Sequence, residues 1–414
     1  MSVPTPGAGT RPLQGVTVCC SLISPWPERN ARAVKIADSL AAAGADVSVV
    51  YLASRDGCLP SGSFRAVRIR PTEIRASEHP NWLLRVMYNV LAALPLMALV
   101  RVLQAYGLDP KLLAALMRER ADIYHAHVLD TALPAYLVTR LRRRARVVYD
   151  VRDLFVESRG AFLTNRQKAY WRWVERFLSR RVDLILSVSR AMGDVVASGS
   201  RGLARIEVVL NGPWECVGNA GLRGGPARLF FQGYYSENRN LAELIMAMQD
   251  LKSHATLTLQ GWGECESELR GLVDELGLHE YVTFLAPCAP REVIRCAREY
   301  DVGVICYRGI TRNLQTTIPN KLLDYIGAGL AIAGSDLPGV RSIIDPYGCG
   351  EPIDPTSAET IAFGLRRMIS DPVRLQRMKE ASARACAELC WDRQAEHLVA
   401  LYAEMLWGAG ADRE

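Results

Sequence analysis

The chain has 414 residues, of which 49% are hydrophobic and 23% charged, and Lys and Arg exceed Asp and Glu by six. This balance is that of a globular protein, so it excludes a disordered chain, a collagen-like fibre and a protein with many membrane spans. The length suits two or three domains or one large α/β body. We take the positive surplus as mild and spread along the chain, which permits an anionic ligand but gives no argument for nucleic acid.

In the first half of the chain, short apolar segments alternate with segments that have the apolar spacing of helices. The expected strands are 16–22, 46–52, 64–70, 122–127, 146–151, 183–189 and 205–210. The expected helices are 29–43, 80–120 with breaks at Pro95 and Pro110, 131–143, 165–180 and a short helix before 205. Because segment 64–70 alternates apolar with basic residues, we expect it to be a half-exposed edge strand.

The alternation stops in 215–227, a glycine-rich segment without periodicity that predicts a linker, and then restarts. The expected strands of the second half are 228–233, 255–261, 281–286, 301–307 and 331–336. The expected helices are 238–252, 264–276, 290–299, 319–328 and most of 356–407. Two such series predict two doubly wound α/β domains, with the ligand site expected beyond the carboxyl ends of the strands, in the cleft between the domains.

Eleven cysteines are scattered along the chain, without a Cys-x-x-Cys motif or the spacing of a zinc finger. We interpret them as small buried thiols in a reducing cytosol. The N-terminal residues have no long apolar core, so we expect no secretory signal. Segment 86–100 is apolar but shorter than the roughly 20 residues of a spanning helix. It is expected to be a buried helix, with a helix lying on a membrane surface as the alternative.

Two turns in the second half carry residues that suit an anionic ligand. Gly233 opens a strand-to-helix turn that contains Arg239, which suits a phosphate; a solvated arginine on an ordinary turn is the alternative. Gly261 and Gly263 form a similar turn, where missing side chains either admit a ligand or allow tight packing.

A third cluster begins a helix in the segment that follows residue 315. Thr316 or Thr317 is expected to cap this helix, and Pro319 to lie in its first turn. Lys321, near the positive end of the helix, suits phosphates. Asp324 lies about one turn later and suits the two hydroxyls of a ribose, whereas a surface pair with Lys321 is the alternative.

The candidate residues of the first half follow two neighbouring strands. We expect the imidazoles of His125 and His127 to point to opposite faces of their strand, so that they cannot share one metal ion. One of them is then a core or supporting residue and the other reaches the ligand site; for His127 a purely structural role is the alternative. Asp150, Asp153 and Glu157 are candidates to bind acceptor hydroxyls or to act as a base, with helix capping by Asp153 as the alternative.

Taken in order, the motifs HAH, YDVRDL, SVS, VVLNG, GYYSENRN, GWGE and PNKLLDYIGAGLAIAGSD resemble those of family 4 glycosyltransferases of the GT-B fold, over roughly residues 15 to 405. The resemblance implies a retaining, metal-independent transfer of a sugar from a nucleotide diphosphate donor, a UDP- or GDP-sugar, which is a substrate and not a cofactor. It implies two Rossmann-like domains facing across a cleft, 1–213 for the acceptor and 226–390 for the donor, with 391–414 returning to the first domain. An ordinary C-terminal helix on the second domain is the alternative for this last segment.

The resemblance also assigns roles to single residues. Arg239 stands where the family has a basic residue on the diphosphate, Asp324 where it has the second glutamate of a pair that holds the ribose, and His127 where a histidine lines the donor-sugar pocket. Pro319 to Lys321 resembles a P-x-K variant of polysaccharide-assembly members. Catalytic roles therefore fall to His127, Arg239 and Lys321. The expected donor-binding residues are Gly233, Gly261, Gly263, Thr316, Thr317, Pro319, Asn320 and Asp324.

The sequence departs from the family pattern at three places. Thr316 stands where the first glutamate of the pair belongs, and Tyr234 where an arginine belongs, so Lys321 is expected to substitute for the missing cation. The loop 24–30 lacks the usual pair of glycines, and it is the loop that normally faces the acceptor. The acceptor-side candidates are Arg29, Asn30, Asp153 and Glu157.

These expectations describe a cytoplasmic transferase that binds neither nucleic acid nor a metal ion. It acts on a glycan or lipid-linked acceptor in cell-surface polysaccharide assembly, with peripheral contact to the inner face of the membrane. The first alternative is a GT-B sugar-nucleotide epimerase, which would need more carboxylates for acid/base chemistry. The second is a degenerate, non-catalytic nucleotide-sugar-binding subunit, which Thr316 and Tyr234 favour.

Overall fold

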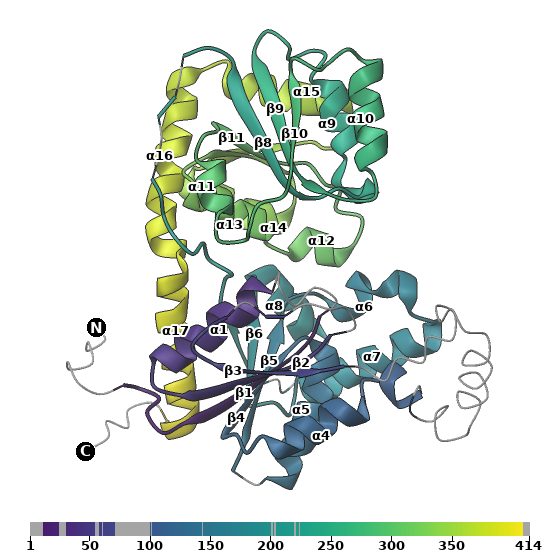
Figure 1. Cartoon of the computed structure of the whole chain (residues 1–414), viewed down its shortest axis with the longest axis vertical. Helices are drawn as coiled ribbons and strands as arrows, with labels where there is room; N and C mark the ends of the chain where they lie inside the picture. Colours follow the sequence, from purple (N-terminus) through teal and green to yellow (C-terminus); the bar gives the residue numbers. More distant parts are fainter. Residues whose placement is uncertain are drawn as a thin grey trace. The chain divides into compact units, whose positions relative to one another are not determined.

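The chain folds into two compact units, which are shown in a computed structural model (Figure 1). The structure describes residues 11–24, 30–53, 58–59, 61–70, 100, 102–142, 144–199, 202, 204–218, 221–222 and 224–408. Unit 1 comprises Met1–Val209 together with Ala395–Glu414, and unit 2 comprises Leu210–Gln394. The chain therefore leaves unit 1 once and returns to it once.

Unit 1 contains a parallel sheet of seven strands in the order β3-β2-β1-β4-β5-β6-β7. Its strands are β1 (Thr17–Ile23), β2 (Asp46–Leu52), β3 (Arg65–Ile69), β4 (Ile123–His127), β5 (Arg146–Val151), β6 (Leu184–Ser187) and β7 (Arg205–Val208). Its helices are α1 (Ala31–Ala42), α4 (Pro110–Arg118), α5 (Leu129–Leu141), α6 (Phe155–Ser158), the short η2 (Gly160–Phe162), α7 (Asn165–Leu178) and α8 (Arg190–Ser198). The half-exposed β3 lies at the edge of the sheet, as its alternating sequence predicts.

Unit 2 contains a parallel sheet of six strands in the order β10-β9-β8-β11-β12-β13. Its strands are β8 (Ala227–Tyr234), β9 (Ala255–Trp262), β10 (Val282–Leu285), β11 (Val302–Ile305), β12 (Ala331–Ser335) and β13 (Gly350–Ile353). Its helices are η3 (Glu237–Arg239), α9 (Leu241–Ala247), α10 (Glu266–Glu275), α11 (Val293–Ala297), α12 (Arg312–Thr316), α13 (Asn320–Gly327), α14 (Pro338–Tyr347), α15 (Ala358–Ile369) and α16 (Pro372–Leu389). The last helix, α17 (Trp391–Trp407), begins in unit 2 and continues in unit 1.

Both units are doubly wound α/β folds, which confirms the fold class predicted from the alternating pattern. Helices lie on both sides of each sheet (Figure 1), so the central strands are buried on both faces and their sequences are almost continuously apolar. The strand order reverses between β1 and β4 in unit 1 and between β8 and β11 in unit 2. Sheets of this kind bind ligands beyond the carboxyl ends of the strands at such a reversal.

Several expectations differ from the structure in detail. Pro110 does not interrupt a helix but begins α4, because the Asp109 carboxylate accepts hydrogen bonds from the amides of Lys111 and Leu112 and caps it. The elements α6, α12, α14 and β13 were not predicted, since most are too short to show a period. Segment 86–100 lies outside the described residues except at its last position. Among the described residues, no helix is long and apolar enough to span a bilayer.

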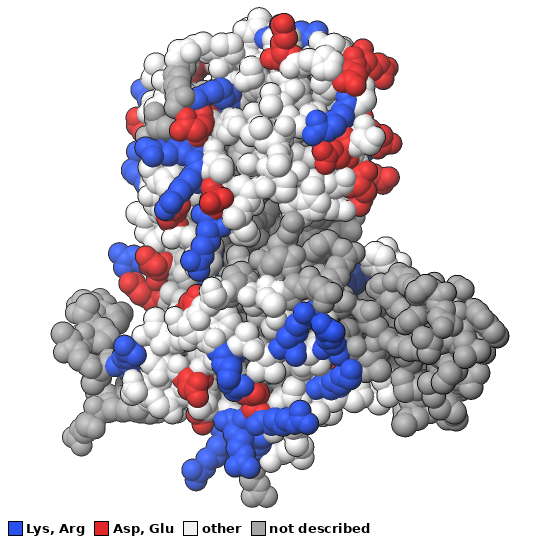
Figure 2. Space-filling model, in the orientation of Figure 1, with Lys and Arg blue, Asp and Glu red and all other residues white. Residues whose placement is uncertain are grey.

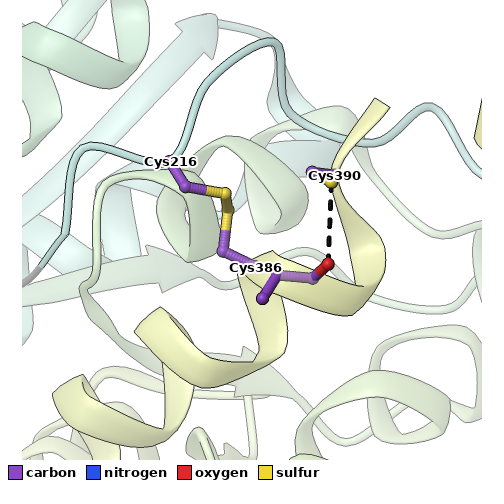
Figure 3. Close-up of a disulfide and its surroundings, with 4 residues drawn as sticks. Cys216, Cys386 and Cys390 are labelled. Carbon is purple, nitrogen blue, oxygen red and sulfur yellow. Dashed lines mark hydrogen bonds between the residues drawn. A yellow bond between two sulfur atoms is a disulfide. The ribbon is translucent and has the colours of Figure 1, made fainter. Parts of the chain in front are cut away.

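The interpretation of every cysteine as a thiol is wrong for one pair. Cys216 and Cys386 form a disulfide with a Cα–Cα distance of 6.0 Å, which joins the segment after β7 to α16 (Figure 3). Close to it, the amide of Trp391 donates to the carbonyl of Pro213 over 3.0 Å. The segments by which the chain enters and leaves unit 2 therefore lie side by side and are covalently joined. Cys390, drawn in the same figure, is a free thiol.

Candidate functional site

The candidate site of unit 2 lies at the carboxyl end of β8, beside the reversal of strand order. Gly233, the penultimate residue of β8, has φ of +140°, a conformation that favours glycine. A Cβ atom placed there would lie 3.2 Å from the Nζ atom of Lys321. The absence of a side chain at Gly233 therefore leaves space for the lysine at the end of the strand.

Two cations meet near this turn without an anionic partner. The Nζ atom of Lys321, on α13, lies 3.6 Å from the centre of the Phe231 ring, and the guanidinium of Arg239 lies 5.5 Å from that of Tyr307. Neither cation forms an ion pair with any residue that the structure describes. Burial lowers the pKa of Arg239, and burial together with the charge of Arg239 lowers the pKa of Lys321 well below its ordinary value. Keeping two buried positive charges close together is unfavourable, as the lowered pKa values show, and such an arrangement indicates a site for an anion.

The helix that carries Lys321 is fixed to β8. The hydroxyl of Tyr325, a buried residue of α13, accepts a hydrogen bond of 2.9 Å from the amide of Gln232. Asp324 is half-exposed on the same helix, about one turn after Lys321, and its charge raises the pKa of the lysine against the larger opposing effects. Asn320 accepts a hydrogen bond of 2.9 Å from the side chain of Asn211. The sequence thus placed Gly233, Arg239, Lys321 and Asp324 in one region of unit 2.

The threonines do not cap α13 as expected, because the unpredicted helix α12 intervenes. Thr316 is the last residue of α12, is 9% exposed, and its hydroxyl donates 2.8 Å to the carbonyl of Arg312. Thr317 follows as the C-cap of α12, and Pro319 itself is the N-cap of α13, with no side-chain hydrogen bond.

Gly261 and Gly263 are explained by packing of β9 against β8. A Cβ atom on Gly261 would lie 1.9 Å from the carbonyl oxygen of Gly233, and one on Gly263 would lie 2.1 Å from that of Tyr235. The neighbouring backbone therefore requires both glycines, which is the alternative that the sequence left open. Tyr234 is 41% exposed, and its hydroxyl donates to Glu264 over 2.8 Å.

In unit 1, a buried network surrounds Asp150 at the end of β5. Arg32 of α1 donates from Nε and Nη2 to the two carboxylate oxygens over 2.9 and 2.7 Å, and from Nη1 to the carbonyl of Val209 over 2.9 Å. Burial opposes ionisation of Asp150, but the charge and hydrogen bonds of Arg32 outweigh it and hold the pKa of Asp150 well below its ordinary value. Asp150 is therefore an ion-paired structural carboxylate, which corrects the expectation that it could be a base or bind an acceptor.

His127 is a neutral imidazole that donates a hydrogen bond to Asp150 in this network. Its Nδ1 atom lies 3.0 Å from an oxygen of Asp150, and an ionised carboxylate only accepts, so Nδ1 carries the proton. Burial, followed by the neighbouring His125, lowers the pKa of His127 to about 3. Its Nε2 atom is buried and has no hydrogen-bond partner among the described residues. A hydroxyl group is the complement of such an atom.

The expectation that the two imidazoles point to opposite faces is wrong. Their ring centres are 4.3 Å apart, because residues two positions apart on a strand share a face. His125 also contacts the hydroxyl of Tyr402, on α17, through Nδ1. Ligand atoms of His125, His127 and Asp150 lie within 4.8 Å of one another. However, both oxygens of Asp150 already bind Arg32, whose positive charge opposes a metal ion there.

The acceptor-side candidates lie in two segments of unit 1. Asn30, just before α1, accepts 2.9 Å from the guanidinium of Arg152, whose pKa is lowered by burial. Asp153 does not cap α6, which has Leu154 as its N-cap and no side-chain hydrogen bond there, so the capping alternative is wrong. Glu157 lies within α6. Arg29, like most of the loop 24–30, lies outside the described residues.

Sequence reasoning missed Arg32 and Tyr402. Arg32 occupies a position of the helix 29–43 at which the apolar spacing predicts a buried side chain. A charged residue at such a position indicates a buried ion pair, so the sequence contained a signal that could have identified Arg32. Nothing in the pattern of α17 distinguishes Tyr402 from its neighbours, since its partner His125 is 277 residues away.

Comparisons with known proteins agree with this arrangement. The model of "Glycosyltransferase Family 4" matches residues 30–212, and the model of "Glycosyl transferases group 1" matches residues 217–385. An uncharacterized glycosyltransferase of Methanocaldococcus jannaschii is 23% identical over 236 residues, in an alignment that covers 53% of this chain and 59% of that protein. The chain thus matches less than two thirds of the length of that relative.

Solved structures share the fold at low sequence identity. Sucrose-phosphate synthase of Thermosynechococcus elongatus has a TM-score of 0.72 at 14% identity, covering 95% of this chain and all of that one. HepE of Anabaena, in complex with UDP and glucose, has a TM-score of 0.67 at 13% identity, covering 94% and 100%. WaaG, a glycosyltransferase involved in lipopolysaccharide biosynthesis, has a TM-score of 0.64 at 15% identity, covering 95% and 100%.

Proposed function

Because the chain belongs to family 4 of the glycosyltransferases and has the GT-B fold, we propose that it transfers a sugar from a UDP- or GDP-sugar to a glycan or lipid-linked acceptor. We further propose that the transfer retains the anomeric configuration, needs no metal ion and serves cell-surface polysaccharide assembly. The relatives HepE, which binds UDP-glucose, and WaaG, which acts in lipopolysaccharide biosynthesis, support this choice of donor and pathway.

The observation that carries the proposal is the pair of unpaired cations beside Gly233. Arg239 and Lys321 have the charge and position to bind a diphosphate, which supplies the anionic partner that both lack. Asp324 then faces the ribose, one helical turn from Lys321. Gly233 supports the role of the lysine, because a side chain there would contact the Nζ atom.

The chemistry follows from where charge develops. When the bond from the anomeric carbon to the phosphate oxygen breaks, negative charge moves to the leaving diphosphate, and two fixed cations stabilise it. The acceptor hydroxyl attacks the same face of the sugar and gives its proton to the departing phosphate oxygen. His127 accepts a hydrogen bond from a sugar hydroxyl at Nε2, since its Nδ1 proton is held by Asp150. Asn30, Asp153 and Glu157 are proposed to line the acceptor side.

The test is turnover with a panel of nucleotide sugars, after thermal-shift screening has identified the base. Arg239→Ala should lower turnover by about 10²- to 10³-fold at a saturating concentration of the nucleotide sugar. Removal of one hydrogen-bond donor to a developing oxyanion has an effect of this size in other enzymes. Arg295→Ala is the matched control, because this exposed arginine of unit 2 pairs with Glu215 away from the turn. Near-normal turnover of Arg239→Ala would show that the diphosphate binds elsewhere.

A non-catalytic sugar-nucleotide-binding subunit is the second candidate. The hydroxyl of Thr316 donates to the backbone of its own helix, and that of Tyr234 to Glu264. At both positions the resemblance calls for a group that contacts the donor. Such a subunit would bind nucleoside diphosphate sugars without hydrolysing them, whereas a transferase shows slow hydrolysis and an epimerase releases an isomerised sugar.

A further inference from the structure

The positive charge of the chain is concentrated in one segment. Residues 140–181 contain thirteen Lys and Arg against four Asp and Glu, an excess of nine, whereas the whole chain has an excess of six. The rest of the chain is therefore slightly acidic, and the expectation that the surplus is spread along the chain is wrong. On the face drawn in Figure 2, Lys and Arg predominate over Asp and Glu in the lower part of the view.

Helix α7 separates its apolar and cationic residues on two faces. Trp171, Val174 and Leu178 are buried against the core of unit 1. Arg172 and Arg176 are exposed one turn apart on the opposite face, and Arg180, two residues beyond the end of the helix, is exposed as well. Trp173 lies between them and is 59% exposed, which is unusual for a residue of this size.

Helix α5 extends this face. Rings join the two helices, because Phe177 of α7 stacks on Trp173 with a centroid distance of 5.4 Å and meets Tyr136 of α5 edge-on at 5.6 Å. Arg140, four residues after Tyr136 and therefore on the same side of α5, is exposed, and the next residue, Leu141, ends the helix and is 71% exposed. We call the residues Arg140, Leu141, Arg172, Trp173, Arg176 and Arg180 the α5–α7 face.

Two of the four acidic residues of the segment, Asp150 and Glu175, do not neutralise this face. Asp150 is buried and bound by Arg32. Glu175 accepts a hydrogen bond of 3.0 Å from the hydroxyl of Tyr149, a fully buried residue, so its carboxylate points inward. Arg172, Arg176 and Arg180 form no ion pair with any residue that the structure describes. Their guanidinium groups are therefore available to phosphates.

We propose that the α5–α7 face binds the surface of an anionic phospholipid bilayer. Guanidinium groups pair with lipid phosphates, and an exposed tryptophan and leucine beside them fit the boundary between headgroups and acyl chains. Leu141 offers a nucleic acid neither a hydrogen bond nor a stacking surface, which favours the bilayer. The inference rests on the proposed function in one respect, since an enzyme with a lipid-linked acceptor works at a bilayer.

The test is flotation of the full chain with vesicles of phosphatidylglycerol and phosphatidylcholine at low ionic strength. Each arginine near such a surface contributes about 1 kcal/mol, and 1.4 kcal/mol is a factor of ten, so replacing Arg172, Arg176 and Arg180 by Ala should weaken binding about a hundredfold. The matched control carries the same loss of charge at three exposed arginines of unit 2. These are Arg270, Arg295 and Arg341.

The proposal predicts that the wild type and the control bind the anionic vesicles equally, and that neither binds pure phosphatidylcholine. Trp173→Ala, which keeps the charge, should also weaken binding, and circular dichroism verifies that each variant is folded. Equal losses in both triple variants, no binding at low salt, or tighter binding to an oligonucleotide than to vesicles would each overturn it. Hydrolysis of the nucleotide sugar without vesicles should be unchanged in the variants of the α5–α7 face. A failure of the membrane-binding proposal is therefore distinguishable from a failure of the proposed function.

Discussion

The Arg32–Asp150 pair allows the sharpest test of the network in unit 1. Arg32 is 2% exposed and Asp150 is fully buried, and Arg32 supplies two of the hydrogen bonds to this carboxylate. Arg32→Met leaves the carboxylate buried; among the described residues the His127 proton is then its one side-chain partner at hydrogen-bond distance, with His125 Nε2 3.6 Å away. Breaking a buried pair in this way costs about 3–5 kcal/mol of the free energy of unfolding. Asp150→Leu leaves the guanidinium unpaired and should cost a similar amount.

The double variant Arg32→Met/Asp150→Leu removes both charges at once. It leaves the Nδ1 proton of His127 unpaired, at about 1–3 kcal/mol, and it loses the bond of Arg32 to the Val209 carbonyl just as Arg32→Met does, so the double variant should be at least as stable as Arg32→Met. The coupling free energy of the cycle then reaches at least about 3 kcal/mol. Arg146→Met is the control, because its pair with Asp183 is half-exposed and contributes about 0–1 kcal/mol.

The measurement is urea unfolding followed by circular dichroism. The reasoning would be refuted by an Arg32→Met variant as stable as Arg146→Met. It would equally be refuted by a double variant whose cost is the sum of the two single costs, since additive effects mean that the two side chains do not interact.

Three further predictions concern protons and the disulfide. Because burial and the charge of Arg239 lower the pKa of Lys321, a bound diphosphate should raise this pKa again. Binding of the donor nucleotide sugar should then take up protons and weaken as pH rises. Calorimetry in two buffers measures the proton uptake, and Lys321→Met should abolish this uptake. The pKa of His127 is about 3 in the folded chain, against an ordinary value of 6.5. Between pH 6.5 and pH 3 this histidine is therefore protonated only in the unfolded chain, so the free energy of unfolding should fall as pH falls through this range. A free energy of unfolding that stays constant over this range in urea unfolding would contradict the prediction. Cys216→Ser removes a disulfide that spans 170 residues and should lower the free energy of unfolding by up to about 5 kcal/mol in the chain-entropy model. The wild type under reducing conditions should be as unstable as this variant. Cys390→Ser, which removes a free thiol, should leave the free energy of unfolding unchanged.

The sequence by itself determined the fold and the donor-side candidates. Strands of a parallel sheet that is covered on both faces must be apolar almost throughout, and the helices between them must have one apolar face, so both patterns are visible without coordinates. Gly233, Arg239, Lys321 and Asp324 were found because they lie near the carboxyl end of a strand or in the first turns of a helix, where the strand order brings ligands. Short elements such as α12 escaped, and with them the position of Thr316.

Only the tertiary structure decided how charges and thiols are paired. Arg32 and Asp150 are 118 residues apart, His125 and Tyr402 are 277 apart, and the cysteines of the disulfide are 170 apart. A local pattern records whether a side chain is buried but not which distant group meets it, since that depends on the order of strands in the sheet and on where the last helix packs. The same holds for the α5–α7 face, because the direction of each arginine is set by what its helix buries.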